Sequence, residues 1–128
     1  MNDIETFGKM MVTCRAWQWM PVMLAVSPAS HDGATGYVYR LTEGYSPVNS
    51  DRAFPHLNDP ATIGCVLSLI QMVYGNEFIC LVADETDPER PWAVRSRSYY
   101  DDRGTKIEFC ISHGKTKAEA LAHALQEG

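Results

Sequence analysis

The chain lacks the features that would place it in a membrane, in a secretory pathway or on nucleic acid. Its longest apolar run, Ile63 to Tyr74, is too short and too interrupted to span a bilayer. The first residues carry neither a basic segment nor a long apolar stretch, so no signal peptide is expected. The chain has only 11 Lys and Arg residues but 16 Asp and Glu residues, which gives a net charge of −5. This balance argues against broad nucleic-acid binding and suits a solvated acidic surface or a basic partner.

Cysteines are few and widely spaced. Cys14, Cys65, Cys80 and Cys110 form no Cys-x-x-Cys motif, which argues against a zinc site or a thioredoxin-like pair. Each lies among apolar neighbours, so we expect small core residues in a reducing, cytoplasmic setting. With 128 residues, 45% of them apolar, the chain is long enough to form one domain over residues 1–128 without a disulfide or metal.

The common catalytic motifs are missing. The sequence contains no Gly-x-Ser-x-Gly elbow, phosphate loop, dinucleotide glycine pattern or His-Glu-x-x-His. Cys110-x-x-His113 could bring a thiol near a base, but its place between a predicted strand and Gly114 favours a core cysteine beside a polar turn. The acidic residues from Asp84 to Glu89 lack the register of a calcium loop and suit a solvated turn. We therefore expect no enzyme, no metal and no cofactor.

Helices and strands are well marked by apolar spacing and by capping residues. Helices are predicted over Asp3 to Cys14, Pro60 to Tyr74 and from the Thr116–Glu119 capping box onward. Strands are predicted over Val22–Val26, Tyr37–Leu41, Phe78–Ala83, Trp92–Tyr100 and Lys106–Ile111, with an irregular connection over Glu43–Asn58. Because short turns join consecutive strands, we expect an α+β sandwich, in which three helices pack against an antiparallel sheet of about five strands.

The main candidate binding residues lie on the predicted strand Trp92–Tyr100 and in the turn that follows. Strand alternation places Arg95, Arg97 and Tyr99 on one face, and the candidates Tyr100 and Arg103 follow closely. Guanidinium groups beside aromatic rings suit a phosphate or carboxylate ligand, a stacked base or a protein hot spot. An ordinary solvated strand face is the alternative.

Two tryptophans near the end of the first predicted helix are further candidates. Trp17 and Trp19 flank Gln18, and together they would suit an exposed aromatic patch. Their position at the end of an amphipathic helix favours core anchoring for at least one of them.

Three segments also carry a resemblance to a known family. They are Trp17-Gln18-Trp19-Met20-Pro21, Leu57-Asn58-Asp59-Pro60-Ala61-Thr62-Ile63-Gly64-Cys65 and Thr116-Lys117-Ala118-Glu119-Ala120-Leu121, with a Trp92-bearing strand between the last two. In this order they resemble small bacteriophage and prophage proteins of the phage ABA sandwich domain type. The resemblance covers most of the chain and departs from the domain between Ser27 and Asn58. It brings no catalytic residues and implies a phage accessory protein in the bacterial cytoplasm.

These observations lead to three functional hypotheses. The first is a non-enzymatic, phage- or prophage-encoded binding protein that occupies a host protein, for instance one of antiviral defence. The second is a small-molecule binder that sequesters a nucleotide signal, with Arg95 and Arg97 on its phosphate. The third is a structural or assembly factor of the virion. A homodimer formed through an exposed edge strand is compatible with each of them.

Overall fold

The computed structural model describes residues 3–27, 37–42, 52–84, 86–96, 99–107 and 109–127. Within them the chain forms α1 (Asp3–Val12), β1 (Leu24–Ser27), β2 (Tyr37–Arg40), β3 (Phe54–Pro55), α2 (Pro60–Tyr74), β4 (Ile79–Ala83), β5 (Trp92–Ser96), β6 (Tyr99–Tyr100), β7 (Lys106–Ile107), β8 (Cys110–Gly114) and α3 (Lys117–Glu127). The α+β class is confirmed, and the predicted helices lie within one or two residues of the observed ones. The short strand β3 falls inside the stretch predicted to be irregular.

The prediction of one five-stranded sheet is wrong. The strands in the described part of the chain form two antiparallel three-stranded sheets, ordered β2-β1-β3 and β4-β5-β8, and a separate ribbon of β6 and β7. The stretch predicted as one hairpin is divided between the second sheet and the ribbon. Alternation along a strand predicts which side faces the core, but it does not predict which strand is the neighbour.

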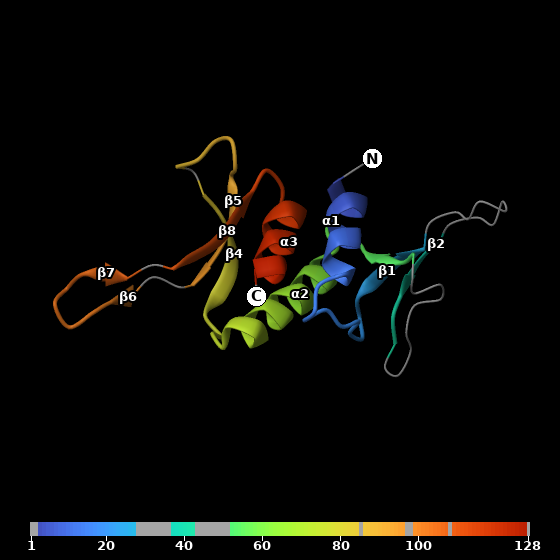
Figure 1. Ribbon diagram of the computed structural model, residues 1–128, viewed down its shortest axis with the longest axis horizontal. Helices are drawn as coiled ribbons and strands as arrows, with labels where there is room; N and C mark the ends of the chain where they lie inside the picture. The colour runs from blue at the N-terminus through green and yellow to red at the C-terminus, as the bar shows by residue number, and fades with distance from the viewer. Residues whose placement is uncertain are drawn as a thin grey trace.

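The three helices lie between the two sheets (Figure 1). Helix α1 packs against β3 and α3, while α3 packs against β8 and β5, and α2 contacts β4 and α3. Each three-stranded sheet therefore turns one face toward the helices. The opposite face of the β4-β5-β8 sheet is turned away from them, and the β6-β7 ribbon extends from the same side of the molecule (Figure 1).

The central position of α3 follows from its small residues. Its buried residues are Ala118, Ala120, Leu121, Ala122, Ala124 and Leu125. Alanines on several sides let α1 and the strand β8 approach the helix closely, while the leucines fill the space between them. The predicted cap is confirmed, because the Thr116 hydroxyl accepts a hydrogen bond from the backbone N–H of Glu119 at 3.2 Å.

A polar network ties the β2-β1-β3 sheet to the start of α2. Asp59 caps the helix by accepting from the backbone N–H of Thr62 at 3.0 Å, and it forms a two-pronged ion pair with Arg40 at 2.8 and 2.9 Å. The hydrogen bonds from Arg40 hold the pKa of Asp59 well below its ordinary value. The buried Thr62 hydroxyl donates to Asp59 and accepts from the backbone N–H of Leu24, both at 2.8 Å. One carboxylate thus connects β2, β1 and α2.

Val22, just before β1, adopts a strained backbone. Its φ is +68°, in the left-handed region that a β-branched residue rarely adopts. Two hydrogen bonds to its backbone hold it there: its N–H donates to the Leu41 carbonyl at 3.0 Å, and its carbonyl accepts from the Arg40 guanidinium at 2.7 Å. The side chain is 50% exposed and contributes little packing to offset the strain.

We expect Val22→Gly to raise the free energy of unfolding by about 0.5–1 kcal/mol, because glycine adopts positive φ without strain but is more flexible when unfolded. Urea unfolding followed by circular dichroism measures the change. Gln18→Gly is the matched control, since Gln18 is exposed and lies outside the positive-φ residues of the described chain. It should be neutral or destabilising. A Val22→Gly protein no more stable than the wild type would show that the turn carries no strain.

Candidate functional site

The candidate set from the predicted strand is divided between two parts of the structure. Arg95 lies half-buried on β5, in the sheet next to the helices. Tyr100 lies on β6 and is 71% exposed, and Arg103 is exposed in the turn after it. Tyr99 pairs with Ile107 in the ribbon, and Arg97 lies outside the described residues. Arg95 and Tyr100 therefore belong to different sheets and share no continuous strand face.

The two tryptophans form a pair at the end of α1. The rings of Trp17 and Trp19 meet edge to face, with centroids 5.2 Å apart and planes at 85°. Both are half-buried and pack against the hydrophobic core. The Trp17 indole nitrogen is buried and has no hydrogen-bond partner among the described atoms. The pair thus anchors the segment after α1, in keeping with the core alternative rather than with an exposed patch.

Residues 99–107 form a projecting arm. It consists of β6, β7 and their connecting turn, and it extends away from both sheets (Figure 1). The Asp101 carboxylate accepts from the backbone N–H groups of Arg103 and Thr105, each at 2.9 Å. Gly104 supplies the positive φ, +79°, that the turn needs. These bonds give the tip of the arm a defined shape. Phe109, where the chain returns to the sheet, is 56% exposed.

A thiol, an imidazole and a carboxylate are in contact on the β4-β5-β8 sheet. The sulfur of Cys110 lies 3.5 Å from Nδ1 and 3.6 Å from Nε2 of His113. His113 Nε2 lies 3.1 Å from Oδ2 of Asp84. The side chains of His113 and Asp84 are 27% and 15% exposed. Cys110 is exposed, so the prediction that it is a core residue is wrong: the register places it on the same face as Arg95, opposite to that of the buried Val94.

The carboxylate of Asp84 is held in its charged form. The hydroxyl of Thr86, at 2.6 Å, and its backbone N–H, at 3.0 Å, both donate to Asp84 and lower its pKa, with a further contribution from His113. An ionised carboxylate accepts hydrogen bonds only, so it selects the form of His113 that carries a proton on Nε2. In neutral His113 this leaves Nδ1 as the acceptor beside the Cys110 thiol.

The strand register places Arg95 next to this thiol. Arg95 pairs with Cys80 of β4 on one side and with Cys110 of β8 on the other. A bulge between Val94 and Arg95 shifts the register, since Val94 pairs with Ser112 and the regular partner of Arg95 would be Ile111. Directly paired residues project to the same face of a sheet. The irregularity therefore brings Cys110, instead of Ile111, beside Arg95.

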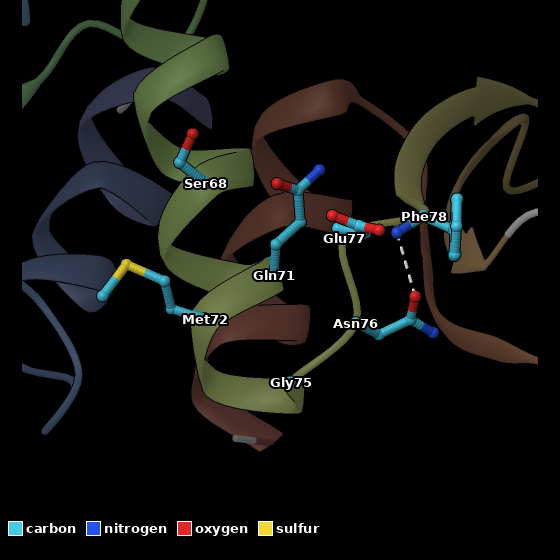
Figure 2. A pocket seen from close by; sticks show the side chains of 7 residues that line it. All are labelled: Ser68, Gln71, Met72, Gly75, Asn76, Glu77 and Phe78. Atoms are coloured by element: carbon cyan, nitrogen blue, oxygen red, sulfur yellow. Dashed lines mark hydrogen bonds between the residues drawn. The ribbon is translucent and has the colours of Figure 1, made fainter.

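A shallow pocket of about 510 Å³ lies at the C-terminal end of α2. Figure 2 shows its lining residues, with Met72 pointing to one side of α2 and Phe78 in the turn just before β4. Both are largely exposed, at 68% and 57%. The polar side chains already serve the chain itself: Gln71 donates to the Ile79 carbonyl, and Asn76 accepts from the Phe78 N–H, each at 2.9 Å. The pocket therefore presents mainly apolar surface at its rim.

In comparisons with known proteins, no family model, curated protein or solved structure matches the chain. The described residues contain no group of three or more His, Cys, Asp and Glu that could hold a metal ion. No helix in the same part of the chain is long and apolar enough to cross a membrane. Functional inference therefore rests on the arm and on the Cys110–His113–Asp84 group.

Sequence reasoning found only part of this group. The spacing of Cys110 and His113 raised the possibility of a thiol near a base, but a core cysteine beside a polar turn was favoured, and Asp84 was assigned to a solvated turn. Asp84 and His113 are 29 residues apart and meet because β4 and β8 flank the same strand, β5. Further along the acidic turn, Asp87 accepts a hydrogen bond from Arg90 at 3.1 Å, a local contact within the turn itself. The sequence contains no pattern that indicates the contact between Asp84 and His113.

Proposed function

We propose that this chain is a non-enzymatic binding protein that engages a partner protein through the arm. The observation that carries the proposal is the exposure of Tyr100 on an arm whose tip is held by its own hydrogen bonds. Tyrosine and arginine are enriched among the residues that dominate protein–protein binding energy. Tyr100 and Arg103 are residues of these two types, and the nearby Phe109 adds a second aromatic ring.

The geometry of the arm supports binding in a further way. A two-stranded ribbon is marginally stable by itself, and an element that orders only on binding reduces affinity. Here the Asp101 carboxylate and the backbone bond from its N–H to the Thr105 carbonyl, at 2.9 Å, hold the turn before any partner arrives. The arm can therefore present its side chains at a small entropic penalty.

The nature of the partner is inferred from charge and from the family resemblance. The net charge of −5 supports a partner with a basic surface. The resemblance to phage ABA sandwich proteins supports a phage or prophage source and a partner in the bacterial cytoplasm, for which an antiviral defence protein is the leading class. Sequestration of a nucleotide signal receives less support, because Arg95 and Tyr100 lie in separate sheets.

Photocrosslinking in bacterial cells tests the proposal. A photoreactive phenylalanine analogue is introduced singly at Tyr100 or Phe109, and at the exposed Thr6 and Gln18 as controls. We expect the two positions near the arm to capture the same protein, identified by mass spectrometry, and the controls to capture none. With that partner purified, Tyr100→Ala should weaken binding about tenfold or more, the loss typical of a hot-spot residue.

Three results would contradict the proposal. They are crosslinks from the arm to a second copy of this chain alone, a partner captured from Thr6 or Gln18 but not from the arm, and an unchanged affinity in Tyr100→Ala. The first would identify the arm as a dimerisation element, and the second would place the interface on α1 and the segment after it.

A further inference from the structure

We propose that Cys110, His113 and Asp84 form an activated-thiol site, at which Cys110 exchanges with small disulfides and becomes covalently modified. The inference rests on the contacts among these three side chains and does not depend on a partner of the arm. It concerns a modification of the chain itself, so it is compatible with a non-enzymatic protein.

The arrangement provides a path for the thiol proton. Asp84 accepts the Nε2–H of His113 at 3.1 Å, which leaves Nδ1 as a base 3.5 Å from the Cys110 sulfur. Because the sulfur is nearly equidistant from the two ring nitrogens, it lies over the face of the imidazole, and rotation of the Cys110 side chain toward the edge of the ring brings the S–H group to Nδ1. Transfer of the proton yields a thiolate beside an imidazolium that Asp84 stabilises.

The chemistry of disulfide exchange matches the groups that are present. The Cys110 sulfur forms a bond to one sulfur of the incoming disulfide, whose S–S bond breaks. The second sulfur leaves with the electron pair and takes the proton from His113, so Cys110 is oxidised and the leaving thiol is reduced. Negative charge is carried by sulfur throughout, so the exchange needs no separate site for an oxyanion, and an exposed thiol permits the in-line approach.

The surroundings limit the exchange to a mixed disulfide with a small thiol. Charges of both signs flank the thiol, because Arg95 lies opposite Cys110 in the register and the ionised Asp84 contacts His113. Cys80 lies on the far side of Arg95, two strand spacings or roughly 10 Å from Cys110, whereas a disulfide requires Cα atoms within about 7 Å. Exchange should therefore stop at the mixed disulfide and not proceed to an internal one.

The experiment uses the full reduced chain and oxidised glutathione at neutral pH. Peptide mapping by mass spectrometry follows each of the four cysteines over time, and Cys14, Cys65 and Cys80 serve as controls within the same molecule. We expect Cys110 to react about ten times faster or more than any of the other three, and to carry one glutathione. The neutral reagent iodoacetamide should give the same ranking, which separates thiol activation from charge attraction.

The variants His113→Asn and Asp84→Asn distinguish activation from exposure. Each should slow the reaction of Cys110 about tenfold while leaving the reaction rates of the other cysteines unchanged. If Cys110 reacts quickly in both variants, exposure alone explains its reactivity and the proposal is overturned. It is overturned equally if Cys110 reacts no faster than Cys65 in the wild type, a comparison that needs no variant to fold.

Discussion

Gly114→Ala is expected to lower the free energy of unfolding by about 3 kcal/mol or more, at the severe end for a single added methyl group. Gly114 ends β8 just before α3, and a Cβ placed on it would lie 2.5 Å from the backbone nitrogen of Ala120 and 2.9 Å from the Thr116 carbonyl oxygen. Both are backbone atoms in the first turn of α3 and its cap, so the helix must shift away from the sheet. Urea unfolding followed by circular dichroism measures the loss.

Gly64→Ala provides the matched control. Gly64 lies in α2, and a Cβ added there meets no atom within 4 Å. Alanine is the better helix former, so this variant should be more stable than the wild type by about 0.5–1 kcal/mol. Similar effects of the two substitutions would contradict the close approach of β8 to α3.

Asp59→Ala is expected to lower the free energy of unfolding by about 2 kcal/mol. The substitution removes the cap of α2 and leaves the buried Thr62 hydroxyl without the acceptor that now lies 2.8 Å away. Loss of a helix cap accounts for about 1 kcal/mol, and an unsatisfied buried hydroxyl adds a similar amount. Asp102→Ala, in the exposed turn of the arm, is the control and should change stability by less than about 0.5 kcal/mol.

The lowered pKa of Asp59 also predicts how the stability that this carboxylate contributes depends on pH. Because Arg40 and Thr62 hold the pKa of Asp59 below its ordinary value, the stabilisation is fully present above about pH 4, the pKa of an unfolded aspartate. It is lost as the pH falls from there toward the lowered pKa of the folded state. The gap in stability between the wild type and Asp59→Asn should therefore narrow below pH 4. A gap that widens in acid would contradict the ion pair.

Local sequence chemistry was sufficient to predict the helices and their ends. Asp59 and Pro60 start α2, Gly75 ends it with a φ of +61°, and Thr116 caps α3, so α2 has the bounds and α3 has the cap that the sequence predicted. Each of these signals acts over three or four residues of one segment, so it operates whatever the rest of the chain does. The apolar face of α3 was predictable for the same reason, since helical periodicity alone places Leu121 and Leu125 on one side.

The arrangement of the strands was decided by tertiary contacts. A strand between Trp92 and Tyr100 was predicted. Pairing with distant segments divides it between the helix-covered sheet and the arm. The same pairing produces the bulge that sets Arg95 opposite Cys110. Backbone pairing is nearly indifferent to side-chain identity, so alternation indicates a strand without naming its partner.

The Cys110–His113–Asp84 group also depends on strand pairing. Residues three apart on a regular strand point to opposite faces, but the bulge in β8 pairs Cys110 with Arg95 and His113 with Ala93, two residues apart on β5, and so places both on one face. Asp84 joins them only because β4 and β8 pair with opposite edges of β5, which brings together side chains 29 residues apart. Whether the thiol is buried or exposed was likewise decided by the fold, because strand pairing places Cys110 on the face of Arg95, opposite to that of the buried Val94.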